Sequence, residues 1–209
     1  MANVNAPRGL IPYRHYDGSV WNGSANIYYA SASNANNFFI GDPVGLIPSQ
    51  NDGNGIPAVT VYTASTQLPA LIGSVVGIVS GGQPIITVTR DLVIYRTASV
   101  AQYILVCDDP TVMFMIQDNG VSGLSPLTWA GKTAALISSA SGSTITGYSG
   151  WNLSGASVGI TGSADLKIMR PLDQADNAVG VTVSTTLYGK WLVKINNHMY
   201  ANATLGSSL

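Results

Sequence analysis

Two runs of bulky apolar residues dominate the hydrophobic pattern of this 209-residue chain, at residues 103–107 and 112–116. Asp108, Asp109 and Pro110 lie between them and are typical of a turn. The pattern predicts two antiparallel strands joined by a tight connection. A half-exposed strand alternates apolar with polar residues, but here both faces of each strand are apolar. One face can rest on a core, and the other needs cover from a loop, a terminal arm or another subunit.

Shorter apolar runs separated by Gly, Pro, Asn and Ser predict further strands. In residues 191–195, Trp191, Val193 and Ile195 should face inward, as in a half-exposed antiparallel strand, with lysines facing water. The other strands are expected at residues 27–30, 38–40, 59–63, 68–79, 85–88, 92–95, 144–148, 158–160, 166–171 and 181–187.

The first 26 residues differ in character from the rest. Pro and Gly are frequent in residues 1–26, so regular structure is not expected there. Several aromatic residues accompany them, whereas a disordered tail is poor in aromatics. We therefore expect an extended arm that docks on its own domain or on a neighbour. Residues 27–209 should form a single β domain with a loop-rich insertion at about residues 120–165. Within it, residues 48–57 favour a surface loop, and residues 132–138 are the only helix candidate.

The composition favours strands over helices. Charged residues make up 9% of the chain, against about a quarter in a typical soluble protein. Glutamate is absent, and Gly, Ser, Thr and Asn are abundant. Thr, Val, Ile, Tyr and Trp favour strands, whereas Glu, Lys, Arg and Gln favour helices. The predicted fold class is all-β, an antiparallel sandwich, jelly roll or barrel-like domain.

The charge pattern narrows the classes of partner. The net charge is −1 and no run of charges occurs, so a nucleic-acid partner and a polybasic membrane anchor are not expected. No secretory signal and no membrane-spanning run of roughly 20 apolar residues is found. So few charges repel one another weakly, which suits a protein packed in an assembly. We expect synthesis and retention in a cytosol-like compartment until assembly.

Motifs for catalysis or cofactor binding are scarce. The Asp108–Asp109 pair favours a turn in which the carboxylates hold backbone N–H groups, with a calcium site as the alternative. Cys107 lies in an apolar run and should be a small buried hydrophobe. His15 and His198 lie in no zinc-ligand spacing, and no phosphate-binding glycine loop occurs. We expect no enzyme activity, no cofactor and no metal. A Ser–His or Cys–His nucleophile brought together by the fold, and a sugar-binding aromatic surface, stay open as alternatives.

Several segments together resemble a group of tailed-bacteriophage virion proteins, some of them capsid decoration (cement) proteins. The likeness is spread over most of the chain and is thin between about residues 120 and 165. It implies no functional residues. The segments are Pro7-Arg-Gly-Leu-Ile-Pro-Tyr-Arg14, Phe39-Ile-Gly-Asp-Pro-Val44, Tyr95-Arg96, Tyr103-Ile-Leu-Val-Cys-Asp-Asp-Pro110, Phe114-Met-Ile-Gln117, Asp176-Asn-Ala-Val-Gly180 and Trp191-Leu-Val-Lys-Ile-Asn-Asn-His198.

This resemblance implies a protein that binds the outer capsid lattice and stabilises contacts between capsomers. Its partners would be the major capsid protein and further copies of itself, as a small symmetric oligomer such as a trimer, on the virion surface. Arms exchanged between neighbours would cover the second apolar face of the central strands. A tail-tube, neck or minor head protein is the alternative, and a tube protein would form rings or open stacks.

Our hypothesis places subunit or capsid contacts in the arm. Deleting residues 2–21 should then abolish capsid binding and leave a folded domain. The candidate contact residues are Arg8, Leu10, Tyr13, Arg14, Tyr16 and Trp21.

Overall fold

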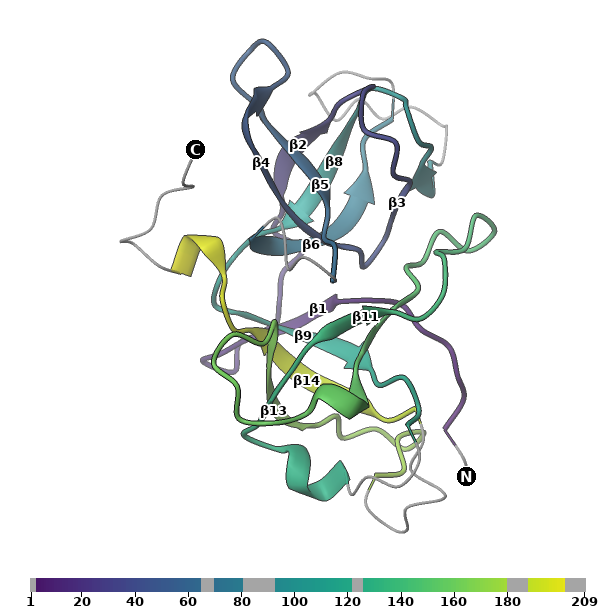
Figure 1. The fold of residues 1–209 in the computed structure, drawn as a ribbon, viewed down its shortest axis with the longest axis vertical. Coiled ribbons are helices and arrows are strands. Elements are labelled where there is room, and N and C mark those ends of the chain that lie inside the picture. The colour runs from purple at the N-terminus through teal and green to yellow at the C-terminus, as the bar shows by residue number, and fades with distance from the viewer. Residues whose placement is uncertain (1–2, 65–69, 81–92, 122–125, 180–187, 202–209) are drawn as a thin grey trace.

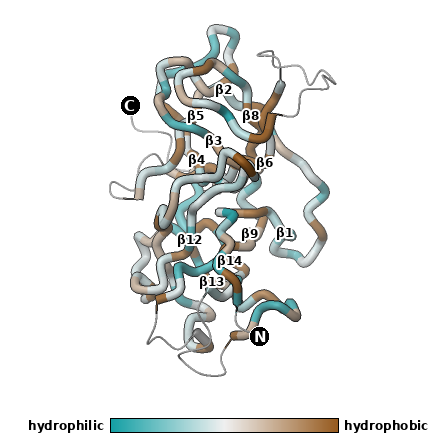
Figure 2. The backbone as a smooth tube through the Cα atoms, turned by 90° about the vertical axis from the view of Figure 1, so that its right-hand side faces the viewer, coloured by the Kyte–Doolittle hydropathy of each residue, from teal (hydrophilic) through white to brown (hydrophobic). Residues whose placement is uncertain are grey.

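The computed structural model describes residues 3–64, 70–80, 93–121, 126–179 and 188–201. Within these ranges the regular structure consists of strands and short 3-10 helices, which confirms the all-β prediction. The two main groups of strands are a closed barrel, at the top of Figure 1, and an open sheet below it. The same two groups lie one above the other in the view turned by 90° (Figure 2).

The barrel joins five strands in the order β2-β5-β4-β6-β8 and closes through pairing of β8 with β2. Only the β2–β5 pair is parallel. Its interior holds a cluster of buried side chains that includes Tyr28, Val44, Ile72, Ile104 and Val106. The strands are β2 (Asn26–Ala30), β4 (Pro43–Asn51), β5 (Pro57–Val61), β6 (Leu71–Ile78) and β8 (Gln102–Cys107).

The open sheet has the order β1-β9-β14-β13-β10, with every pair antiparallel. One face carries a second cluster, around Phe114, Trp191 and Val193, to which the barrel contributes Leu71 and Cys107. The β11–β12 hairpin also packs into this cluster, so the sheet is sandwiched on that face. The strands are β1 (Ile11–His15), β9 (Val112–Gln117), β10 (Thr133–Ala134), β11 (Leu136–Ser138), β12 (Trp151–Leu153), β13 (Leu166–Pro171) and β14 (Lys190–Ile195).

The remaining elements are short. β3 (Phe38–Phe39) pairs with β7 (Tyr95–Arg96). Arg96 is fully buried, and its guanidinium donates to the carbonyls of Ser31, Asn34, Asn36 and Val100. A buried cation thus fixes two loops at the top of the barrel. The 3-10 helices are η1 (Pro126–Trp129), η2 (Gly155–Ser157) and η3 (Met199–Ala201).

The predicted hairpin between residues 103–107 and 112–116 is wrong, although both strands exist. β8 belongs to the barrel and β9 to the open sheet, so Asp108 and Asp109 connect two sheets. For β8, this explains why both faces are apolar. In β8, Ile104 and Val106 fill the barrel, while Cys107 enters the cluster of the open sheet. The second face of β8 is covered within the chain itself.

Several local predictions are also wrong. Residues 11–15 are strand β1 rather than irregular, and residues 132–138 form parts of β10 and β11 rather than a helix. β4 runs on to Asn51, into the predicted surface loop, although its last residues are exposed as a loop would be. The predicted strands at 144–148 and 158–160 are reduced to isolated bridges at Tyr148 and Gly159. Residues 85–88 and 181–187 lie outside the described residues.

Candidate binding surface

β1 forms one edge of the open sheet and pairs with β9 from Ile11 opposite Met115 to His15 opposite Val112. The chain then turns back on itself. The Gly18 amide donates to the His15 carbonyl at 3.0 Å, and the backbones of Arg14 and Val20 form an isolated antiparallel β-bridge. Residues 11–20 thus form a short two-stranded projection at the sheet edge.

The turn of this projection is fixed by its own side chains. The Asp17 Oδ1 atom accepts from the amide of Ser19 at 2.9 Å and from its hydroxyl at 2.7 Å, and these bonds lower the pKa of Asp17. Asp17-Gly18-Ser19 is a hairpin-turn signal in the sequence. That signal could have identified the projection, and Val20 with it, without a structure.

Hydrogen bonds from His15 and Tyr16 to Thr111 attach the projection to the connection between β8 and β9. The Tyr16 amide donates to the Thr111 carbonyl at 2.8 Å, and the His15 Nδ1 atom lies 3.0 Å from the Thr111 hydroxyl. Asp109 accepts from the Thr111 amide and hydroxyl at 2.7 Å each, which confirms that it holds a backbone N–H group. Burial opposes ionisation of Asp109, but the bonds from Thr111 and the charge of His15 outweigh it and lower its pKa.

Three apolar or aromatic side chains project from this hairpin into solvent, and we call them the edge surface. The exposed fractions are 38% for Tyr13, 63% for Tyr16 and 80% for Val20. The Arg14 guanidinium lies 5.3 Å from the centre of the Tyr13 ring, and Lys194 Nζ lies 5.5 Å from that of Tyr16. Such cation–π contacts orient the rings. Both exposed rings of the edge surface therefore have a cationic neighbour.

The six predicted contact residues are not brought together. Tyr13 and Tyr16 lie on the edge surface, with Arg14 beneath Tyr13. Arg8 lies elsewhere, its guanidinium 4.9 Å from the centre of the Tyr148 ring. Trp21 is half-buried against the cluster of the open sheet.

The prediction that Leu10 is a contact residue is wrong. Its side chain is 0% exposed within the cluster of the open sheet, so it cannot also contact a neighbour. Deleting residues 2–21 would remove Leu10 and all of β1, so the expectation of an intact domain after that deletion conflicts with the structure. A hydrophobic residue in a Pro- and Gly-rich segment looks the same in sequence whether it fills a core or a contact.

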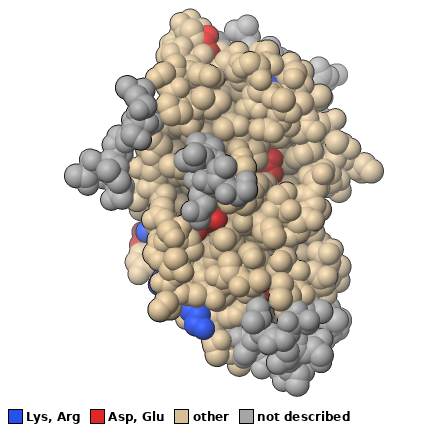
Figure 3. Space-filling model, in the orientation of Figure 1, with Lys and Arg blue, Asp and Glu red and all other residues tan. Residues whose placement is uncertain are grey.

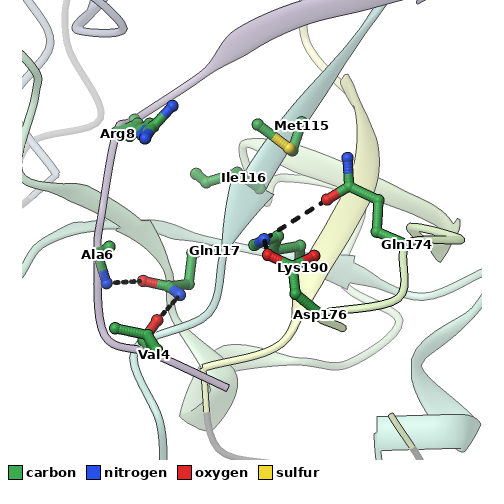
Figure 4. Close-up of a pocket in the computed structure, with 10 residues that line it drawn as sticks. Val4, Ala6, Arg8, Met115, Ile116, Gln117, Gln174, Asp176 and Lys190 are labelled. Atoms are coloured by element: carbon green, nitrogen blue, oxygen red, sulfur yellow. Dashed lines mark hydrogen bonds and ion pairs between the residues drawn. The ribbon is translucent and has the colours of Figure 1, made fainter. Parts of the chain in front are cut away.

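A second surface feature is a cavity of about 440 Å³ between residues 4–9 and the ends of β9 and β14 (Figure 4). Met115 and Gln117 line it from β9, and Lys190 lines it from β14, where it pairs with Asp176. These side chains lie on the face of the sheet opposite Phe114 and Trp191, because residues alternate along a strand. The cavity therefore opens on the face that lacks the sandwiching β11–β12 hairpin.

Most buried polar groups near the two-sheet connection have structural partners, although the buried Nε2 atom of His198 has no hydrogen-bond partner in the part of the chain that the structure describes. Asp108 accepts from the Asn26 side chain at 3.0 Å and the Tyr28 hydroxyl at 2.6 Å. Cys107 is fully buried, as predicted, and burial raises the pKa of its thiol to about 12. His198 is buried, which lowers its pKa. Among the described residues, no group of three or more His, Cys, Asp or Glu side chains is placed to hold a metal ion.

Charged side chains are sparse on the face drawn in Figure 3. Across the described ranges, no helix is long and apolar enough to span a membrane. Comparison with known proteins adds no relative: no family model, no curated protein and no solved structure matches the chain.

Proposed function

We propose that this chain is a virion structural protein of tailed bacteriophages that decorates the outer capsid lattice. It would be made in the host cytoplasm and then bind the assembled shell as a small symmetric oligomer such as a trimer. Its partner there is the major capsid protein. In this proposal the function of the molecule consists of binding to protein partners. The resemblance of its sequence segments to virion proteins supports this class.

The edge surface is the observation that carries the proposal. Tyr13, Tyr16 and Val20 lie within eight residues on a hairpin that is fixed to the sheet. Single exposed apolar residues are ordinary on protein surfaces, but exposed aromatic side chains close in sequence to an exposed aliphatic one are more typical of interface anchors. An oligomer presents this group several times at once, so contacts that are individually weak add to stable attachment.

The test is co-sedimentation of the purified chain with shells of the phage that encodes it, compared with unassembled capsid protein. We expect saturable binding to shells alone. Replacing Tyr13, Tyr16 and Val20 together by serine should weaken binding at least about tenfold, because tenfold corresponds to only about 1.4 kcal/mol of lost apolar contact. The matched control replaces Ile145 and Ile160, which are also highly exposed, by serine and should bind normally.

The outcomes separate the proposal from its alternatives. Equal binding by the edge-surface variant and the control would remove the edge surface as the contact. Rings or stacks of purified protein that ignore shells would favour a tail-tube component. Binding of the free protein to glycans would favour a sugar-binding module instead.

A further inference from the structure

Residues 3–8 lie across the cavity face of the open sheet as an extended segment and are held there at two points (Figure 4). We call residues 3–8 the strap, and Gln117 with Ala178 the seat. The first point is the Gln117 carboxamide, which donates to the Val4 carbonyl at 2.7 Å and accepts from the Ala6 amide at 3.0 Å. The second is the Asn3 carboxamide, which exchanges two bonds with the backbone of Ala178, at 3.1 and 2.9 Å.

These four bonds join a carboxamide to a backbone N–H and C=O. Such recognition reads the main chain of an extended segment, as in the addition of a peptide to a sheet. The spacing also matters, because the segment must offer an Asn side chain one residue before the carbonyl that Gln117 binds. The strap of this chain carries that combination.

Apart from the contact of the Arg8 guanidinium with the Tyr148 ring, side-chain packing adds little to the hold on the strap. Val4 is 74% exposed, and Asn5, Ala6 and Arg8 are exposed as well. The space between the strap and Met115 is the cavity of about 440 Å³ rather than a packed interface. Segments with few buried apolar contacts belong to the least stable parts of a fold and open locally.

The packing of the chain becomes close at Gly9. Gly9 has a φ of +70°, and a Cβ there would lie 2.1 Å from the Gly41 carbonyl oxygen. The next residue, Leu10, donates its amide to the same carbonyl at 2.8 Å and buries its side chain in the core. Residues from Gly9 onward are therefore fixed, and the strap can leave its seat without disturbing them.

From this geometry we infer that the strap is exchanged between copies of the chain, each strap occupying the seat of a second copy. The second copy is the partner that fits, because its strap brings the same Asn3 side chain, Val4 carbonyl and Ala6 amide at the same spacing. Exchange of an identical element needs no new complementarity and closes into symmetric oligomers. The inference deepens the proposed capsid function by naming the self-contact, and it rests on that function for its biological purpose.

Full-length variants can separate the strap from the seat. Gln117→Leu keeps a side chain of similar size but loses the two bonds to the strap, and with them the Gln117 bond to the Tyr188 carbonyl, so only the Ala178 half of the seat remains. Asn3→Ala combined with Ala6→Pro removes the Asn3 carboxamide and the Ala6 N–H donor. Each variant alone should sediment as a monomer at concentrations where the wild type is oligomeric. Mixed one to one, they should form a heterodimer, since the intact strap of the first enters the intact seat of the second. The control Asn5→Ala, an exposed strap residue, should sediment like the wild type.

A second measurement does not depend on how well those variants fold. Ala6→Cys and Met115→Cys, at two positions that line the same cavity and leave the four bonds of the seat in place, are put in separate chains of different tag mass and treated with a short bismaleimide. The native Cys107 is buried and should not react. Exchange predicts a covalent hybrid of the two chains, and its absence would overturn the inference. So would a wild type that stays monomeric up to millimolar concentration, or an oligomer that neither strap nor seat variant weakens.

Both experiments use isolated protein without shells, so they are independent of the capsid proposal. A monomer that binds shells refutes the exchange alone. An exchanging protein that ignores shells refutes the capsid function alone.

Discussion

Replacing Leu10 by alanine should destabilise the fold by about 3 kcal/mol, within the roughly 2.7–5 kcal/mol measured for buried leucines. Leu10 is 0% exposed and packs in the cluster of the open sheet. Its removal takes away the buried methyl groups and leaves a cavity, because the surrounding strands relax only partly. The upper part of the range is not expected, since Leu10 precedes an edge strand that can shift inward.

The matched control is Tyr13→Ala, three residues further along. Tyr13 is 38% exposed and lies at the irregularity in the β1–β9 register. Its truncation should cost about 1 kcal/mol or less, as is usual for surface positions. The difference between the two variants tests whether this segment is built into the core or only laid on it.

Urea denaturation followed by tryptophan fluorescence and by circular dichroism is the assay. With a slope of about 2–3 kcal/mol per molar urea, a loss of about 3 kcal/mol lowers the midpoint by roughly 1–1.5 M. The two probes should give coincident transitions, because the barrel contributes Leu71 and Cys107 to the cluster of the sheet. A loss below about 1 kcal/mol for Leu10→Ala would show that Leu10 is not a core residue and that the hydrophobic segment before β1 is peripheral.

Three further predictions concern buried or constrained positions. Burial raises the pKa of Asp42 from 3.8 to about 6, so the folded state prefers the protonated acid and its stability falls by about 3 kcal/mol as pH rises between these values. In urea titrations, Asp42→Asn should therefore be more stable than the wild type above pH 7 and equally stable near pH 4. Equal stability of the two proteins at both pH values would contradict this. Arg96→Met should lower the free energy of unfolding by more than about 3 kcal/mol, because it leaves four backbone carbonyls without their donor. It should also speed hydrogen exchange in residues 31–37, and unchanged exchange would show that the guanidinium does not fix the loop. Gly9→Ala should destabilise the fold by several kcal/mol in thermal melts. Gly18 also has a positive φ but faces open space, so Gly18→Ala should cost only about 1–2 kcal/mol. Similar losses for the two variants would rule out the clash with Gly41.

The strands themselves were largely predictable from the sequence. β2, β9, β13 and β14 all lie where apolar runs or alternation placed them. The alternation in β14 was the most informative, because it fixed the inward face correctly, with Trp191, Val193 and Ile195 buried. A period of two is a property of the strand alone, so the local sequence is sufficient to reveal it.

The pairing of strands was not predictable in the same way. β8 and β9 are continuous apolar runs, and such runs do not indicate which sheet covers which face. The short connection at residues 108–111 suggested a hairpin, since neighbouring strands usually pair. Closure of β8 onto β2 and β6 depends on contacts with residues about 30 to 80 positions away, which no local pattern records.

The exposed residues of the edge surface were predicted in part. Tyr13 and Tyr16 were found because aromatics are unexpected in a Pro- and Gly-rich segment. Val20 was missed, although the turn at Asp17 pairs its strand with β1. Lys194 beneath Tyr16 could not have been found, because it comes from β14, far along the chain.

Residues 3–20 divide at Gly9 into two parts that are held in different ways. Before it, residues 3–8 are held by polar bonds and bury little, so their release costs the core nothing. After it, Leu10 and β1 complete the open sheet, and the same strand carries Tyr13 outward at the irregularity in its register. One short segment can therefore supply both an exchangeable contact and a rigid one. Self-association and attachment to a larger surface would then use different residues, and each could be lost without the other.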